Sequence, residues 1–438
     1  MSGYPFIVER YLFPEGRDTE IFLRALVQEP KNAEKVYERI LLGTIMDALF
    51  LMDREVMFDT LKRLICDYSG SLRRALDFIV DDEEMRERKI ALDLMEASVH
   101  LSNGRHEECV AVLQASMGLA KSTRERFWTM LSLERAISSR DAGRAKDLLE
   151  ELMKLDLSDR ERALVENEYG KLLWFCDDYQ GAGERFGNFL KLADDDFLKS
   201  IAYNNMALSE CCTGGYARAL ELLERSVSLC EKIGDVTGTL RARMNMGEMY
   251  REMGALNEAQ SLLESVLNEV RAVSTSAGAR IRADCYINLA EIEILRNRID
   301  SALELCDKAE TEQCGDEMIE LRALLVMAKA CAFRSQTDDA MKLINSALSL
   351  AENIRSRRYE GAAYLVRGTI QEKSGNYVEA LQSYGLAILF FRKINNLYEV
   401  ANTEERIGKL YERMKEGAKA EEHMRKAKEI TELFRTQK

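Results

Sequence analysis

Proline is scarce in this 438-residue chain. Its three prolines are Pro5, Pro14 and Pro30, so the 408 residues that follow Pro30 contain none. Because proline normally marks turns and strand ends, such a long proline-free stretch favours helices. The hydrophobic fraction, 46%, is ordinary for a globular protein and provides enough material for a substantial core.

Other absences exclude whole classes of function. The net charge is -13 and no basic stripe is evident, whereas nucleic-acid-binding surfaces depend on Lys and Arg. The first ten residues, MSGYPFIVER, lack the basic and apolar regions of a secretory signal. The longest nearly apolar run, residues 40–52, is interrupted by Asp47 and is shorter than the roughly 20 residues that span a bilayer. We therefore expect a cytoplasmic protein with no nucleic-acid or membrane partner.

Motifs for enzymatic chemistry are also missing. The ten cysteines are scattered without a C-x-x-C pair, and disulfide frameworks belong to short secreted chains, so we expect reduced and mostly buried thiols. His100, His106 and Cys109 are close in sequence, but no fourth residue has the spacing of a zinc ligand. We find no phosphate-binding loop, no H-E-x-x-H motif and no nucleophile with a matching base. The sequence thus predicts no enzymatic activity, no metal and no cofactor.

What the chain does contain is an internal repeat. The segments GGYARALELLERSVSL (214–229), GALNEAQSLLESVL (254–267) and GNYVEALQSYGLAI (375–388) share a turn residue, then a small residue followed by apolar residues at helical spacing. Successive small residues, which we call anchors, are 36 to 43 residues apart. The anchors are Cys109, Ala145, Ala182, Ala219, Ala259, Ala302, Ala340, Ala380 and Ala420.

A second small position accompanies each anchor. Twelve residues upstream, eight of nine positions hold Gly or Ala, and Leu133 is the exception. These positions are Ala97, Leu133, Gly170, Ala207, Gly247, Ala290, Ala328, Gly368 and Gly408. The spacing predicts helical hairpins in which the two backbones approach closely where the small residues lie.

This pattern resembles the tetratricopeptide repeat family. Residues 243–253 (RMNMGEMYREM), followed by Gly254 and Ala259, carry the resemblance well. It covers residues 86–438 and implies an all-α, right-handed superhelical solenoid of antiparallel helix hairpins. Residues 418–438 are unusually charged and suit a C-terminal capping helix, because a terminal repeat needs a polar outer face. Two features depart from the family pattern. The period is nearer 40 than the usual 34 residues, which resembles the longer-helix variants, and the family's proline near the repeat end is absent.

Residues 1–85 do not fit the repeat register. Twelve residues before Ala75 stands Arg63, which is not small. The segment still reads as helical, and we expect a separate N-terminal bundle or an irregular cap on the first repeat. A degenerate pair of repeats is the alternative.

Three asparagines indicate a candidate site. Asn205, Asn245 and Asn288 each stand two residues before the small position of a first helix. Asparagine is a poor helix former, so its recurrence at one position needs a reason. The resemblance implies that this position faces the concave groove, where a carboxamide offers both a donor and an acceptor to the backbone of an extended peptide. The alternative is that each asparagine bonds a neighbouring helix and only orders the stack.

Four further residues are expected on the same face. Asn204 adjoins Asn205, while Arg241, Arg322 and Lys329 are cations that could hold a carboxylate of the ligand. We therefore predict a non-enzymatic scaffold or adaptor that holds an extended segment of a protein or peptide partner in the groove. The alternative is a peptide-sensing regulator, because a helical N-terminal region before long-period repeats resembles the bacterial quorum-sensing regulators of the response-regulator phosphatase type. In that case residues 1–85 would engage a target.

Overall fold

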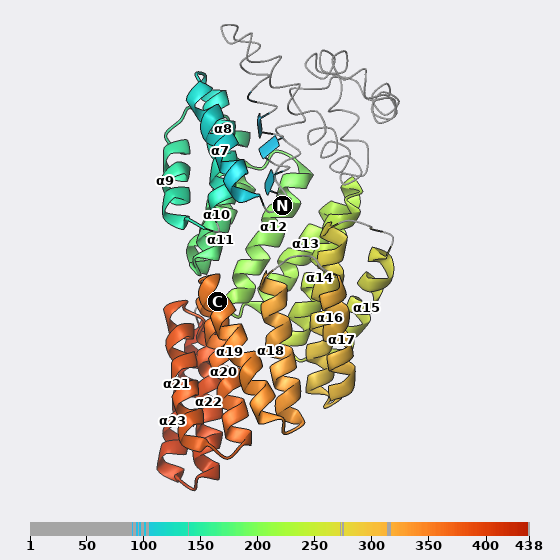
Figure 1. The fold of residues 1–438 in the computed structure, drawn as a ribbon, viewed down its shortest axis with the longest axis vertical. Helices are drawn as coiled ribbons and strands as arrows, with labels where there is room; N and C mark the ends of the chain where they lie inside the picture. Colours follow the sequence, from blue (N-terminus) through green and yellow to red (C-terminus); the bar gives the residue numbers. More distant parts are fainter. Residues whose placement is uncertain are drawn as a thin grey trace. The chain divides into compact units, whose positions relative to one another are not determined.

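The computed structural model describes residues 105–436, apart from positions 139, 272, 274–275 and 313–316, and a few residues between 90 and 101. The chain forms two compact units, Met1–Ser158 and Asp159–Lys438. Among the described residues every regular element is an α-helix (Figure 1), which confirms the predicted all-α class. The boundary predicted at residues 85 and 86, and all of 1–85, lie outside the described residues.

The helices follow one another as hairpins, each with a first and a second helix. The described helices of the first unit are α7 (His106–Leu119), α8 (Thr123–Ile137) and α9 (Ala142–Leu152). The first helices of the second unit are α10 (Asp159–Phe175), α12 (Asp196–Cys212), α14 (Val236–Glu252), α16 (Ser276–Leu295), α18 (Glu317–Phe333), α20 (Arg357–Lys373) and α22 (Leu397–Arg413). The second helices are α11 (Tyr179–Leu192), α13 (Tyr216–Ile233), α15 (Leu256–Val270), α17 (Ile299–Thr311), α19 (Thr337–Asn353), α21 (Tyr377–Lys393) and α23 (Gly417–Thr436).

The anchors lie where the repeat predicted them. Each of the nine is the fourth residue of its helix, and their exposed fractions lie between 0% and 3%. The small residue twelve positions earlier makes room for the side chain four residues after the anchor. A Cβ atom on Gly247 would lie 2.7 Å from the Leu263 side chain, and one on Gly368 would lie 2.5 Å from Tyr384. Small residues are therefore required where the two helices of a hairpin meet.

The turns between the two helices of a hairpin are formed without proline. In each hairpin of the second unit, the residue five positions before the anchor has a positive φ, as at Gly254 (80°) and Gly375 (81°). Asn297, Ser335 and Lys415 occupy the same position with φ near 60°. A left-handed residue ends an α-helix and reverses the chain without proline. This recurring turn is how the chain alternates between helices from Asp159 to Thr436 without proline.

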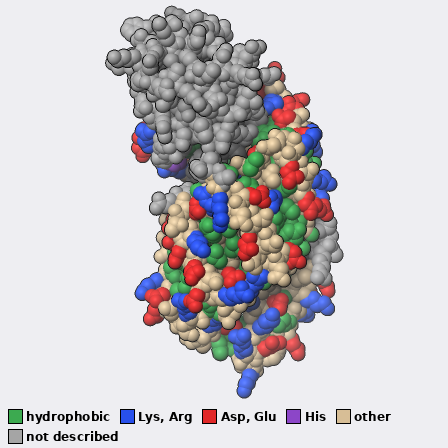
Figure 2. Space-filling model, turned by 90° about the vertical axis from the view of Figure 1, so that its right-hand side faces the viewer, with side chains coloured by type: hydrophobic (Ala, Val, Ile, Leu, Met, Phe, Trp, Pro, Cys, Tyr) green, Lys and Arg blue, Asp and Glu red, His purple; other side chains and the backbone are tan. Residues whose placement is uncertain are grey.

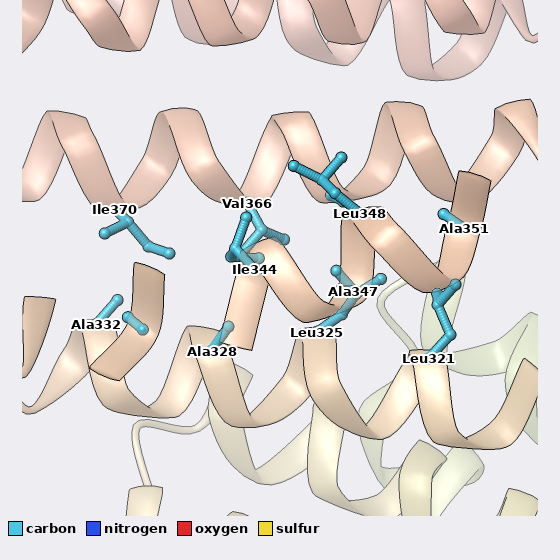
Figure 3. Packing of buried hydrophobic residues seen from close by; sticks show 12 residues of the cluster. Leu321, Leu325, Ala328, Ala332, Ile344, Ala347, Leu348, Ala351, Val366 and Ile370 are labelled. Atoms are coloured by element: carbon cyan, nitrogen blue, oxygen red, sulfur yellow. The ribbon is translucent and has the colours of Figure 1, made fainter. Parts of the chain in front are cut away.

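Stacking of hairpins makes the core continuous. Between α18, α19 and α20, Leu321, Leu325, Ile344, Val366 and Ile370 are buried in one cluster (Figure 3). The cluster joins one hairpin to the first helix of the next. Because a single hairpin leaves one apolar face uncovered, each hairpin depends on its neighbours for burial.

First helices of neighbouring hairpins also contact one another. Such contacts link α14 with α16, α16 with α18 and α18 with α20. Hairpins come closest on the inner side of a curved stack, so the first helices form the inner face of the second unit. In Figure 1, α15 and α17 lie at one margin of this unit and α21 and α23 at the other.

The second unit also closes on itself. Trp174 and Tyr179, from the hairpin of α10 and α11, share a hydrophobic cluster with Phe391 and Val400 of α21 and α22. Cys212, at the end of α12, belongs to the same cluster. Hairpins about 200 residues apart in sequence are thus packed together, and we call this contact the closure.

Candidate functional site

A chain of asparagines links three first helices on the inner face. Asn205 Nδ2 on α12 donates to Asn167 Oδ1 on α10 at 2.9 Å. Asn245 Nδ2 on α14 donates to Asn204 Oδ1 on α12 at 3.0 Å, and Asn204 Nδ2 lies 3.5 Å from Asn205 Oδ1. Two predicted residues, Asn204 and Asn245, therefore meet across neighbouring hairpins, whereas the partner of Asn205 is Asn167, which was not predicted.

Asn288 on α16 has a different environment. Its side chain has no exposed surface. Its Nδ2 donates to the carbonyl oxygen of Asp284 at 2.9 Å, and its Oδ1 accepts from Arg251 Nε and from an Arg322 guanidinium nitrogen, both at 3.2 Å. In this conformation Asn288 bridges α14 and α18, and a ligand would reach it only by displacing one of these bonds.

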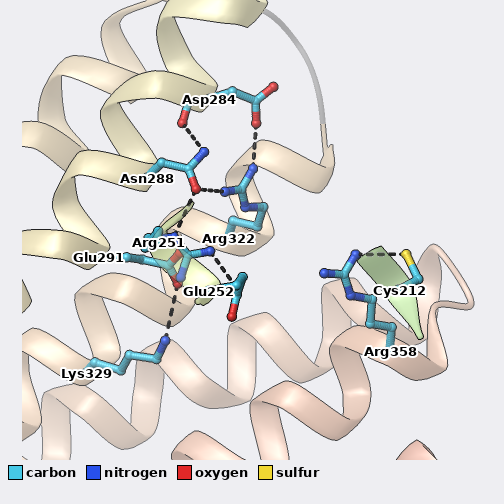
Figure 4. A network of polar contacts seen from close by, with 9 residues as sticks. All are labelled: Cys212, Arg251, Glu252, Asp284, Asn288, Glu291, Arg322, Lys329 and Arg358. Atoms are coloured by element: carbon cyan, nitrogen blue, oxygen red, sulfur yellow. Dashed lines mark hydrogen bonds and ion pairs between the residues drawn. The ribbon is translucent and has the colours of Figure 1, made fainter. Parts of the chain in front are cut away.

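A charged network continues the line of polar contacts from α14 to α18 (Figure 4). The Arg322 guanidinium donates to an Asp284 carboxylate oxygen at 2.6 Å. Glu291 accepts from Arg251 at 3.0 Å and from Lys329 at 3.3 Å. Arg251 also pairs with Glu252 at 2.7 Å. In Figure 4 these side chains converge from three first helices, while the pair of Arg358 and Cys212 stands apart.

The network is strongly coupled electrostatically. Burial alone would raise the pKa of the Glu291 carboxyl, but Arg251, Lys329 and Arg322 outweigh it and lower that pKa to about 2. Burial would likewise lower the pKa of the Arg322 guanidinium, yet the carboxylates of Glu248 and Asp284 raise it. Glu291 therefore stays ionised at any physiological pH.

Six of the seven predicted site residues fall in these two groups of contacts. They are Asn204, Asn205, Asn245, Asn288, Arg322 and Lys329. Arg241 lies near the start of α14, where its charge opposes the burial that raises the pKa of the Cys230 thiol. Asn204, Asn205, Arg241 and Lys329 keep part of their surface exposed, whereas Asn245 and Asn288 are buried. That these residues bind a peptide stays a prediction.

Sequence reasoning missed several partners in the network, although the register contained the signal. Asp284 and Arg322 both stand eighteen residues before their anchors, and Glu291 and Lys329 both stand eleven before theirs. Equal positions in neighbouring hairpins lie side by side, so opposite charges there predict ion pairs. Asn167 stands fifteen residues before Ala182, one position off the asparagine register, which is why it was not found.

Polar contacts reinforce the closure. The Asp177 carboxylate accepts from the Tyr179 hydroxyl and from the Arg357 backbone nitrogen, each at 2.7 Å. Arg358 donates to Cys212 Sγ at 3.3 Å, and the rings of Tyr216 and Tyr398 meet edge to face at 5.2 Å. Burial raises the pKa of Asp177, while its bonds to Tyr179 and Arg357 lower it. Asp177 is thus a buried acceptor shared by both sides of the closure.

Three sequence expectations can be compared with the described residues. Of the eight cysteines described, six are buried and all are free thiols. Within that part of the chain no group of three or more His, Cys, Asp or Glu side chains is placed to hold a metal ion. No described helix has both the length and the apolar character needed to cross a bilayer.

On the face shown in Figure 2, acidic and basic side chains are interspersed.

Comparison with known proteins agrees with the observed hairpins. Residues 198–272 match a family model described as tetratricopeptide repeat. The chain is 22% identical over 396 residues to a TPR repeat-containing protein of Methanocaldococcus jannaschii. That alignment covers 85% of this chain and 64% of the relative, so this chain spans just under two thirds of the relative's length.

Two solved structures are similar in fold. A Rap protein complexed with competence and sporulation factor has a TM-score of 0.62 at 12% identity, covering 80% of this chain and 99% of that chain. NprR in complex with its cognate peptide NprX has a TM-score of 0.53 at 18% identity, covering 77% and 98%. With the recurring hairpins and the family match, these likenesses show that the described part of the chain is an all-α solenoid of tetratricopeptide-like repeats with a period near 40 residues.

Proposed function

We propose that the inner face of the second unit binds an extended peptide or protein segment, and that the protein is a non-enzymatic scaffold or adaptor. The observation that carries this proposal is the polar line of side chains across α10, α12, α14, α16 and α18. Neighbouring packed helices are about 8–10 Å apart and an extended chain advances about 3.3 Å per residue. Each hairpin would therefore face about three residues of the ligand.

The similar solved structures support a peptide as the ligand. One is a Rap protein complexed with competence and sporulation factor, and another is NprR complexed with its cognate peptide NprX. Both share the fold of this chain at low identity. Their likeness therefore favours the class of ligand and leaves its sequence open.

Exposure divides the proposed contact residues into two groups. Asn204, Asn205 and Lys329 are partly exposed, so they can bond a ligand without a change in the helices. Asn245 and Asn288 are buried, and Asn288 already uses both its donor and its acceptor in internal bonds, so a ligand would reach them only after a rearrangement. Arg322 and Arg241 are partly exposed cations suited to a carboxylate of the ligand.

A peptide screen tests the proposal. Extended peptides would be screened against the wild-type protein and against Asn205→Ala. Losing up to two hydrogen bonds, each worth about 0.5–1.5 kcal/mol net, should weaken a true ligand about 5- to 100-fold. Asn345→Ala is the matched control, because Asn345 is exposed on the second helix α19 and should leave affinity unchanged.

The alternative role of the asparagines gives the opposite pattern. If they only order the stack, Asn205→Ala would lower the melting temperature, since Asn167 Oδ1 would lose its donor, and every ligand would bind both proteins equally. That result would remove the inner-face asparagines from the proposed site.

A peptide-sensing regulator is the second candidate function. The likeness to the Rap and NprR structures favours it. In that case residues 1–85 would engage a target and respond to ligand bound by the repeats. Hydrogen exchange of residues 1–85, measured with and without a peptide found in the screen, separates the two functions. A scaffold should show no change there, whereas a regulator should.

A further inference from the structure

The outer surface of α21 is unlike that of the other second helices. Val378, Leu386 and Leu389 expose 61%, 40% and 48% of their surfaces. Leu386 and Leu389 stand six and nine residues after the anchor. The other second helices of this unit carry polar residues there: Asn188, Arg225, Ser265, Lys308, Ser346 and Lys426 at six, and Lys191, Ser228, Asn268, Thr311, Ser349 and Glu429 at nine. The apolar pair is therefore a departure specific to α21.

The three apolar residues form one stripe with Gly385. Positions 378, 385 and 389 are separated by seven and four residues, which places them on one side of a helix, with Leu386 at the edge of that side. The opposite side of α21 holds Ala380, Tyr384, Ala387 and Phe391, all buried against neighbouring helices. The stripe thus faces outward and is not needed for the packing of its own hairpin.

Among the described residues Gly385 has no neighbour that requires a glycine. A Cβ atom added at this position would meet nothing within 4 Å. After proline, glycine is the least favourable residue in a helix interior, and an exposed site usually takes a better helix former. A glycine beside exposed leucines is useful where another backbone approaches closely. Its place in the middle of the stripe leaves room for a second helix to approach α21 closely from outside.

Charges at the two ends of the stripe are self-complementary. Leu386 lies seven residues after Glu379 and seven before Lys393, and both charged residues are exposed. If a second α21 packs antiparallel across a two-fold axis near Leu386, Glu379 of each copy comes opposite Lys393 of the other. Lys393 Nζ also lies 5.3 Å from the Phe390 ring centroid, which keeps it at this end of the helix. An unrelated helix would need this charge pattern by coincidence.

We propose that α21 is a homodimer interface, in which its apolar stripe packs antiparallel on the same stripe of a second copy. A two-fold axis uses one patch twice, which is the commonest arrangement in homo-oligomers. A single helix pair covers less than the roughly 800 Å² per partner of a standard stable interface. The dimer should therefore dissociate on dilution. Because α21 is a second helix, this contact leaves the inner face open to ligand and does not depend on the proposed function.

Sedimentation velocity over the micromolar range tests the apolar part of the interface. The wild-type protein should change from monomer to dimer as its concentration rises. Leu386→Glu combined with Leu389→Glu should raise the dissociation constant at least tenfold. Leu295→Glu is the matched control, because Leu295 at the end of α16 is 62% exposed and lies outside the stripe. It should dimerise like the wild type.

Charge exchange tests the antiparallel register. Glu379→Lys alone places like charges at both ends of the interface and should weaken dimerisation, as should Lys393→Glu alone. The double exchange restores opposite charges and should recover the wild-type dissociation constant. Circular dichroism of each variant confirms that it is folded. A wild-type protein that stays monomeric throughout, or stripe variants that dimerise unchanged, would overturn the proposal.

Discussion

Glycines at the close approach of paired helices are the residues on which each hairpin depends most directly. Gly247 lies on α14 where a Cβ atom would meet Leu263 of α15 at 2.7 Å, and Leu263 is wholly buried. The neighbour cannot move into solvent, so a larger side chain must push the helices apart. The same geometry recurs at Gly170 against Phe186 and at Gly368 against Tyr384.

Gly247→Leu should therefore lower the free energy of unfolding by about 1–3 kcal/mol through overpacking. Chemical denaturation followed by circular dichroism measures the change. Gly385→Ala is the control at low protein concentration. It adds a methyl group in open space and should stabilise the helix by up to about 1 kcal/mol. Equal stability of Gly247→Leu and the wild type would mean that the predicted repeat register is wrong.

Glu291 is the basis of a second prediction about a single residue, because the pKa of its carboxyl is lowered to about 2 in the folded protein. An unfolded glutamate has a pKa of about 4.3, so the carboxylate stabilises the fold above that value and loses its effect as the pH falls toward 2. Glu291→Gln leaves Arg251 and Lys329 without their shared anion and should cost about 1–3 kcal/mol at neutral pH.

The decisive measurement is how the loss of unfolding free energy caused by Glu291→Gln depends on pH. The gap in unfolding free energy between wild type and Glu291→Gln should be constant near neutrality and narrow below about pH 4.3. Glu304→Gln, an exposed position on α17, should show almost no gap at any pH. A gap for Glu291→Gln that persists unchanged to low pH would contradict the ionic role.

The helices themselves were largely predictable from the sequence. Burial forces a small anchor at the start of every second helix, and that requirement repeats often enough to reveal the period. The matching rule for a small residue twelve positions before the anchor has an exception. Leu133 occupies that position on α8 and is nonetheless fully buried. The asparagines were correctly placed on first helices. Their bonding partners were not predictable, because a carboxamide binds a neighbouring helix and a ligand through the same two groups.

At the scale of a whole element, the contacts between α22 and α23 in the last hairpin lead to a prediction. On α22, Ile407 and Leu410 are buried, and Gly408 faces Met424 of α23. Tyr411 stacks on His423, and the Glu404 carboxylate lies 2.6 Å from His423 Nδ1. The second helix thus covers one side of α22 and presents charged residues outward.

Deletion of residues 418–438 should therefore uncover that side of α22 and cause aggregation at concentrations where the full chain is soluble. Light scattering during purification and storage measures this. A shorter deletion of residues 433–438 is the control, since it keeps Ile430, which packs in the closure cluster. If the protein without residues 418–438 stays soluble and as stable as the full chain, these residues do not form a cap.

At the scale of the whole second unit, the closure is the feature that repeat rules do not specify. Each hairpin is rotated slightly from the last, and only the accumulated rotation decides whether distant hairpins meet. The resulting contacts join residues 180 apart in sequence, as between Asp177 and Arg357, or 146 apart, as between Cys212 and Arg358. They lie at turns and helix ends, outside the periodic positions from which the fold was predicted.

Weakening the closure should open the unit without unfolding it. Tyr398→Ala removes an edge-to-face ring contact with Tyr216, worth about 0.5–1.5 kcal/mol, and Arg358→Ala removes the bond to Cys212. Stacking of neighbouring hairpins is untouched, so helical content should be retained. Small-angle scattering of the double variant should therefore give a larger radius of gyration with an unchanged circular dichroism spectrum. Phe333→Ala, at the exposed end of α18, is the control and should scatter like the wild type. If the double variant keeps the wild-type radius, stacking alone fixes the curvature and the closure contacts merely fill the space that it leaves.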